Sequence, residues 1–237
     1  MFGLGHKVFG GGPRTHRQEI GSGRGAGGPD HVPGPSSGLA AGTMVATAMG
    51  WRPAEAIERG DLVLTFDRGM QPVKAVISDL AWVALEECIP PLWPLAVPAG
   101  ALGNARPMLL LPDQMVMLES DTAESVYGDP FTLVRAADLN GFRGIARVQP
   151  RGPVETIELQ FEHDEVVFAD NGGLVFCDSG SVVTVDDLMR GYVPESYRSL
   201  DSEEARYLIQ CLQVEDSVST GYDPVARPAG GPYAAFA

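Results

Sequence analysis

Short runs of β-branched and other apolar residues, each ended by turn residues, dominate the middle of the chain. The run 154–161 alternates most clearly, with Ile157, Leu159 and Phe161 on one face, a pattern typical of a half-buried strand. Turn signals at 67–69, 128–130, 140–141 and 170–173 separate the runs. Many short strands predict an all-β architecture with much antiparallel pairing. The runs lie at residues 43–47, 61–66, 71–77, 108–111, 115–118, 131–134, 144–148, 154–161 and 165–169.

Helical patterns are scarce, and the sequence predicts only two helical segments, one short and one long. Pro53 and the acid after it begin a single turn over 53–57, and Gly60 ends it. Near the C-terminus, residues 202–213 have the spacing of an amphipathic helix, and Ser202 is the expected N-cap. We therefore predict a helix that packs on the sheets through Ala205, Leu208, Ile209 and Leu212.

The two ends of the chain differ in composition from its middle. Residues 1–37 are rich in glycine and proline and bury too little apolar surface to offset the entropy of ordering, so we expect a disordered tail. We place one domain at residues 38–180, an extension that carries the predicted helix at 181–215, and a loosely ordered tail at 216–237.

The formal net charge of -14 argues against a nucleic-acid partner or an anionic membrane, because a like-charged surface repels phosphates. Proteins, cations and small molecules remain as candidate partners. The chain has no unbroken apolar run long enough for a membrane span and no secretory signal pattern at Met1. We expect a cytoplasmic protein, although export by a route without a signal peptide stays open.

Cysteines 88, 177 and 211 are odd in number and have no CxxC spacing, so the sequence predicts neither a disulfide framework nor a zinc site. No Walker-type glycine loop, His-Glu-x-x-His or Gly-x-Ser-x-Gly motif is present. The acidic pairs at 164–165 and 186–187 lack the spacing of a calcium loop, and we expect them to form a solvated face. We therefore expect no metal and no cofactor. The aspartyl-prolyl bond in Gly128-Asp-Pro130 is expected to be a turn.

Several stretches, taken in order, resemble the bacterial kind of Hint (hedgehog/intein) domain. The first is Gly42-Thr-Met-Val-Ala-Thr, followed by Gly50-Trp-Arg-Pro-Ala-Glu-Ala-Ile-Glu-Arg-Gly-Asp-Leu-Val-Leu-Thr. The later ones are Pro98-Ala-Gly-Ala-Leu-Gly-Asn, Val134-Arg-Ala-Ala-Asp-Leu and His163-Asp-Glu-Val-Val-Phe-Ala-Asp-Asn-Gly-Gly. The resemblance implies a compact, horseshoe-like β fold with pseudo-twofold halves, here followed by a C-terminal amphipathic helix.

The resemblance also implies a chemistry, because active Hint domains break their own backbone in autoprocessing or protein splicing. In that family a first-residue cysteine attacks the preceding carbonyl, and a Thr-x-x-His stretch assists, with the imidazole protonating the departing nitrogen. In this sequence the cysteine position falls on Gly38, the threonine on Leu111 and the histidine on Gln114. The resemblance therefore predicts a degenerate active site without nucleophile or acid.

Two other side chains are candidate remnants of such a site. Ser37 lies beside the expected cut and has a hydroxyl that forms esters, but it is one residue out of register. His163 matches a histidine of the bacterial subfamily, and we expect it to be a structural residue where a strand begins.

These observations leave three hypotheses. The first is a structural or protein-interaction module without self-cleavage, and hence without enzymatic activity. The second is an autoprocessing domain that still cuts near Ser37-Gly38. The third is a ligand-binding module that uses the vacated active-site cleft between the Gly38 strand and the Gln114 segment. Fold resemblance alone does not choose among them.

Overall fold

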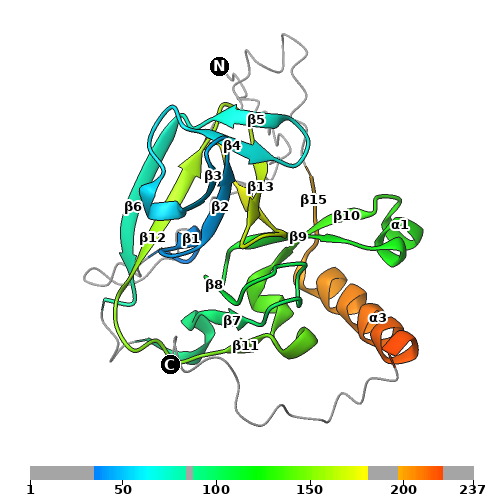
Figure 1. Cartoon of the computed structure of the whole chain (residues 1–237). Helices are drawn as coiled ribbons and strands as arrows, with labels where there is room; N and C mark the ends of the chain where they lie inside the picture. Colours follow the sequence, from blue (N-terminus) through cyan, green and yellow to red (C-terminus); the bar gives the residue numbers. More distant parts are fainter. Residues whose placement is uncertain (1–34, 84–87, 181–196, 221–237) are drawn as a thin grey trace, which may run out of the picture. The chain divides into compact units, whose positions relative to one another are not determined.

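The computed structural model describes residues 35–83, 88–180 and 197–220 (Figure 1). Most of the predicted N-terminal tail, the acidic pair at 186–187 and residues 221–237 lie outside the described residues. The described chain forms two β-sheets, two α-helices and several short 3-10 turns, and the predicted all-β fold with a C-terminal helix is confirmed.

The first sheet has six antiparallel strands in the order β11-β7-β8-β1-β12-β6. Strand β12, next to the edge strand β6, pairs with β1 on one side and along its whole length with β6 on the other. The strands are β1 (Leu39–Ala40), β6 (Ala75–Ala81), β7 (Leu95–Val97), β8 (Met108–Leu110), β11 (Ala146–Arg147) and β12 (Val154–Gln160).

The second sheet has nine strands in the order β15-β10-β9-β14-β13-β2-β4-β5, with β3 paired to β2. All of its pairs are antiparallel except β10 with β15. The strands are β2 (Met44–Thr47), β3 (Gly50–Pro53), β4 (Leu62–Thr65), β5 (Gly69–Pro72), β9 (Met115–Glu119), β10 (Phe131–Arg135), β13 (Glu165–Ala169), β14 (Gly173–Cys177) and β15 (Arg198–Ser199).

The predicted run 71–77 contributes to both sheets, which the sequence pattern did not reveal. Pro72 ends β5, because a proline has no N–H for the ladder. Val73 then exchanges backbone hydrogen bonds with Gly60 and Asp61 before β6 begins in the other sheet. The run 71–77 therefore spans a corner between the two sheets.

The largest hydrophobic cluster among the described residues joins both sheets and the C-terminal helix. Leu39 and Ile157 enter it from the first sheet, Val45 and Val167 from the second, and Leu208 from α3 (Ser202–Thr220). Each of these side chains is at most 3% exposed. The alternation predicted for 154–161 is confirmed, because Ile157, Leu159 and Phe161 are all buried.

Short helical turns connect the strands. The turn predicted at 53–57 is η1 (Ala54–Ala56), and others are η3 (Pro90–Leu92), η4 (Ala136–Leu139) and η5 (Phe142–Gly144). The sequence pattern missed α1 (Asp121–Tyr127), whose N-cap Ser120 accepts hydrogen bonds from the next turn. Gly128 ends α1 with a left-handed conformation, and Asp129 Oδ1 then accepts from Phe131 N–H at 2.9 Å, so the expected turn is confirmed.

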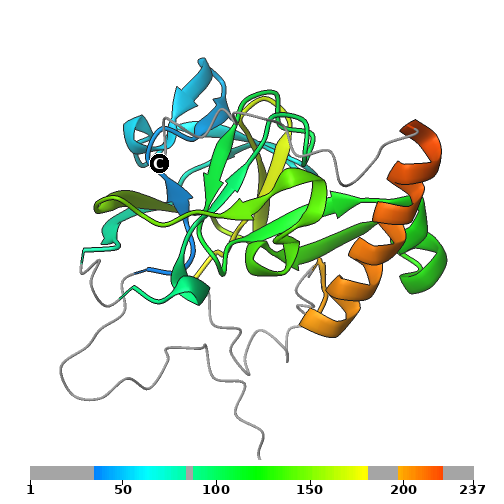
Figure 2. The same cartoon turned by 90° about the horizontal axis from the view of Figure 1, so that it is seen from below.

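The C-terminal helix α3 lies beside α1 and η4 (Figures 1 and 2). Its predicted buried face is confirmed, since Ala205, Leu208, Ile209 and Leu212 belong to the core. It runs on to Thr220 instead of ending near 213, and a bidentate ion pair between Arg143 and Asp216 holds this added length. No helix among the described residues is long and apolar enough to cross a membrane.

The N-cap of α3 is not the predicted Ser202. Asp201 Oδ1 accepts hydrogen bonds from Glu203 N–H and Glu204 N–H at 2.8 and 2.9 Å, and Glu204 Oε2 accepts from Asp201 N–H. This is a capping box that begins one residue earlier. The Ser202 hydroxyl is engaged with Arg135 and Asp138 instead.

Candidate functional site

Gly38 lies immediately before β1, at a bend that only glycine takes up readily. Its φ is +109°, and a Cβ added to it would lie 3.3 Å from Ile157 O. Its N–H donates a 2.8 Å hydrogen bond to Gln114 Oε1. The peptide between Ser37 and Gly38 is therefore held by a side chain 76 residues further along the chain.

Gln114 lies between β8 and β9 and is 3% exposed. Besides accepting from Gly38 N–H, its amide donates from Nε2 to Met115 O at 2.9 Å and to Phe176 O at 2.8 Å. Only this orientation of the amide gives each of the three groups a partner of the opposite kind. Gln114 thus ties together the start of β1, the start of β9 and the end of β14.

The structure brings together two of the three positions predicted from the resemblance. Gly38 and Gln114 are hydrogen-bonded, whereas Leu111 is fully buried in a separate cluster with Ala40 and Trp82. Ser37 is exposed on the other side of the same peptide bond. Among the described residues, no side chain forms a hydrogen bond with the Ser37 hydroxyl that would activate it.

A cleft of about 220 Å³ opens beside this peptide bond. Ser37, Gly38 and Gln114 line it together with Cys177, which the sequence reasoning did not single out. The other lining residues are Leu39, Asp113, Met115, Ile157, Glu158, Leu159, Phe176 and Asp178. The cleft thus lies between the Gly38 strand and the Gln114 segment, and His163 is not among its lining residues. His163 lies in the turn between β12 and β13.

Cys177 is the only nucleophilic thiol among the residues that line the cleft. Burial raises the pKa of this thiol to about 12, and the negative charges of Glu158, Glu165 and Asp178 act in the same direction. A thiolate is the reactive form of cysteine, and this surrounding disfavours it at neutral pH. The strand that carries Cys177, β14, was missed in the sequence pattern, so nothing there placed this residue near Gly38.

Glu165 corrects the expectation of a solvated acidic face at 164–165. It is 1% exposed, it lies opposite Cys177 in the β13–β14 ladder, and its Oε2 has no hydrogen-bond partner among the described residues. Arg68 Nε lies 3.7 Å from its Oε1. Burial raises the pKa of Glu165, and Thr65 and Arg68 only partly offset this.

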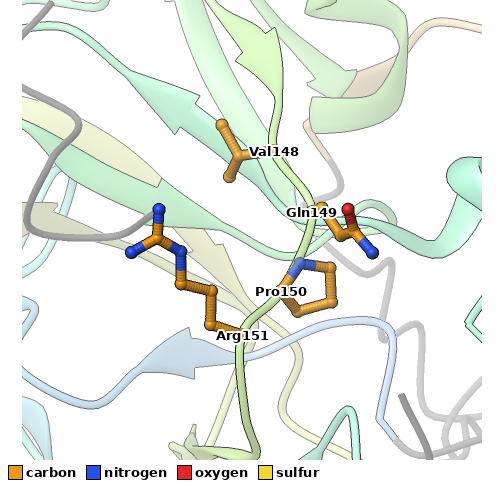
Figure 3. A pocket seen from close by; sticks show the side chains of 4 residues that line it. All are labelled: Val148, Gln149, Pro150 and Arg151. Carbon is orange, nitrogen blue, oxygen red and sulfur yellow. The ribbon is translucent and has the colours of Figure 1, made fainter. Parts of the chain in front are cut away.

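No group of three or more metal-ligating side chains occurs in the described part of the chain. A second hollow is lined by Val148, Gln149, Pro150 and Arg151, all from the connection between β11 and β12 (Figure 3). These four residues include no carboxylate, imidazole or thiol. We therefore place the candidate site at the cleft beside Gly38.

The sequence profile of the Hint domain matches residues 37–187. The chain belongs to the Hint domain family. The matched region begins one residue before Gly38, and it contains every residue that lines the cleft. This Hint domain thus carries at its N-terminal edge the peptide bond held by Gln114.

Solved structures with a similar fold are intein-related. A bacterial intein-like domain from Clostridium thermocellum is 19% identical and covers 59% of this chain and 98% of its own, with a TM-score of 0.43. The MchDnaB-1 intein is 15% identical, with coverage of 58% and 98% and a TM-score of 0.39. The gp41-1 intein is 14% identical, with coverage of 60% and 98% and a TM-score of 0.36. Since all three TM-scores are below 0.5, no site residue is transferred from these structures. A search of curated proteins found no match.

Proposed function

We propose that this Hint domain does not cleave its own backbone and serves as a protein-interaction module. The observation that carries the proposal is the hydrogen bond from Gly38 N–H to Gln114 Oε1. Cleavage of the Ser37–Gly38 bond requires a proton donor facing the departing nitrogen. Here the atom that faces this nitrogen is an acceptor, and the donor Nε2 is engaged with Met115 O and Phe176 O.

The nucleophile is missing for a second, conformational reason. Gly38 has no side chain, and its φ of +109° and the nearby Ile157 O disfavour any side chain at this position. Cys177 lines the same cleft, but the raised pKa of its thiol keeps it protonated at neutral pH. Both reactive groups that an acyl transfer needs are therefore inactive or absent at this bond.

The interaction half of the proposal rests on charge and on the absence of a recognisable catalytic set. The net charge of -14 favours cationic partners and disfavours nucleic acid, and the described residues contain no metal cluster. We also propose a cytoplasmic location for the protein, in keeping with three cysteines that show no pairing pattern.

Intact-mass spectrometry of freshly purified protein tests the loss of cleavage. We expect one species at the full-length mass, unchanged after a day with dithiothreitol or hydroxylamine, which attack thioesters and esters. A Cys177→Ala variant should likewise give one species, at its own full-length mass. A fragment that begins at Gly38 would overturn the proposal, and its disappearance in Cys177→Ala would identify the thiol as the nucleophile.

Replacing Gly38 by cysteine together with Gln114→His tests what prevents the reaction. Gly38→Ala serves as the control for backbone strain, and Gly152→Ala as the control for an unstrained glycine with open space around it. We expect Gly38→Ala to lose about 1–3 kcal/mol of stability. The double variant should lose more, because it also removes the Gln114 hydrogen bonds, and should remain uncleaved. A cleaved double variant would show that residue identity alone, and not the backbone, had silenced the site.

A further inference from the structure

Strand β6 forms one edge of the first sheet. Among the described residues it pairs only with β12, over its full length from Ala75 to Ala81. The strand contains no proline and no lysine, the residues with which proteins commonly protect such an edge. Figure 1 shows β6 beside β12 at the margin of the described fold.

The ladder fixes which backbone groups of β6 point outward. Glu155 O accepts from Ala41 N–H, so the polar backbone groups of Glu155 face β1 and those of the next residue, Thr156, face β6. Asp79 lies opposite Thr156 and therefore faces β12. Because backbone direction alternates along a strand, the N–H and C=O groups of residues 76, 78 and 80 point away from the sheet. Leu80 N–H agrees, since it donates to Asp79 Oδ1 at 2.7 Å instead of to β12.

The side chains at this edge combine apolar surface with negative charge. Ile77 and Leu80 are 46% and 49% exposed, and they lie on opposite faces of the strand. Asp79, Glu155 and Glu158 surround them and are exposed. Among the described residues, none of these three carboxylates forms an ion pair. Lys74, immediately before the strand, is already paired with Glu162 at 3.2 Å.

We propose that the outer edge of β6 binds an extended basic segment of another protein by strand addition. The inference rests on the interaction half of the proposed function and names its surface. Backbone hydrogen bonds to residues 76 and 78 supply the register, apolar partner side chains cover Ile77 and Leu80, and flanking lysines or arginines neutralise the carboxylates. A second copy of this chain fits poorly, because both copies carry the same negative charge and β6 contains no basic residue.

A labelled hexapeptide tests the backbone pairing directly. The probe is fluorescein-labelled, amidated Lys-Val-Lys-Lys-Val-Lys, whose two valines lie three residues apart and on opposite faces of a strand, as Ile77 and Leu80 do. Binding to the full chain is measured by fluorescence anisotropy. Two N-methylated versions block the odd or the even backbone N–H groups. We expect one version to bind about tenfold more weakly or worse and the other to bind like the parent, because only one side of a strand faces its neighbour. The acidic analogue with glutamate in place of lysine should not bind.

A variant of the edge provides the matching test on the protein. Ser78→Pro removes an N–H that points away from the sheet, so every hydrogen bond between β6 and β12 keeps its donor. Ser78→Thr keeps this N–H. We expect Ser78→Pro to weaken binding about tenfold or more, and Ser78→Thr to bind as the parent does. If Ser78→Pro does not fold, the N-methylated peptides decide the question.

Three outcomes would overturn the strand addition: no binding of the parent peptide, equal binding of both N-methylated versions, or equal binding by Ser78→Pro and Ser78→Thr. Equal binding of both methylated versions would mean that charge alone attracts the peptide. These outcomes do not depend on whether the protein cleaves itself, because intact-mass spectrometry tests cleavage without any peptide. If the protein cleaves itself but still distinguishes the two methylated peptides, the proposal of strand addition at β6 stands and the proposed loss of cleavage is wrong.

Discussion

At the scale of single residues, Gln114 is the group on which the cleft depends. Its amide meets two backbone acceptors and one backbone donor from three separate elements, and it is almost wholly buried. A buried backbone group that loses its partner costs about 1–3 kcal/mol. Gln114 therefore stabilises the very place where the resemblance put an acid.

Replacing Gln114 by alanine should destabilise the domain by about 2–4 kcal/mol, because Gly38 N–H and Phe176 O lose their partners together. Urea denaturation measures this change in the free energy of unfolding. Gln213→Ala, on the exposed side of α3, is the matched control and should change it by less than about 0.5 kcal/mol. Equal effects of the two substitutions would contradict the bridging role.

The sequence predicted some residues of the site and missed others. Motif order placed Gly38 and Gln114 in one site, and the structure joins them by a hydrogen bond. Cys177 and Glu165 were missed as members of this region, because their positions follow from the pairing of β13 with β14 and not from any local pattern. A charged residue among polar neighbours in the sequence, such as Glu165, is expected to be exposed, and only the pairing of the strands shows that it is buried.

At the scale of elements, the C-terminal helix shows both what periodicity reveals and what it leaves out. The apolar spacing identified the buried face correctly, because that face repeats with the helix. The start of the helix depends on a single side chain that accepts hydrogen bonds from the free N–H groups of the first turn. Two adjacent residues, Asp201 and Ser202, are both of a type that can do so.

The identity of this cap gives a prediction at the same scale. Asp201→Ala should reduce the free energy of unfolding by about 1 kcal/mol, because Glu203 N–H and Glu204 N–H lose their acceptor. Asp201→Asn keeps an oxygen in place and should cost only a few tenths of a kcal/mol. Thermal unfolding followed by circular dichroism compares the two. A larger loss for Asn than for Ala would exclude the cap.

The strands show a similar division. Runs such as 115–118 and 165–169 were found because each is long enough to show its pattern. The two-residue and three-residue strands β1, β7 and β15 carry too few residues for a period of two to stand out. The division of 71–77 between β5 and β6 also escaped the pattern, because the two parts are adjacent in the sequence and only their pairing with different strands separates them.

At the scale of the whole molecule, the buried Glu165 links folding to pH. Its pKa is higher in the folded chain, chiefly through burial, than in the unfolded chain. A group with a raised folded-state pKa stabilises the fold fully below its unfolded pKa of about 4.3 and loses that contribution as pH rises through the folded value. Glu165 therefore makes the domain less stable at neutral pH than its packing would allow.

Glu165→Gln should remove this cost, because the neutral amide keeps nearly the same shape. We expect the variant to have a higher Tm than the parent at pH 7.5 and to lose that advantage near pH 4, where the parent carboxyl is protonated. Differential scanning calorimetry across this range provides the comparison, with the exposed Glu119→Gln as control. A constant difference at all pH values would mean that packing and not ionisation is responsible.

The sequence alone determined the properties that repeat locally or add up over the chain. These are the strand-rich composition, the buried face of the C-terminal helix, the negative charge, and the ordered motifs that resemble the Hint family. Only the tertiary structure decided which groups meet. Gln114 reaches Gly38 across 76 residues, and β6 has no second partner strand within the described part of the chain, because hydrogen bonding between distant strands depends on sheet order and register.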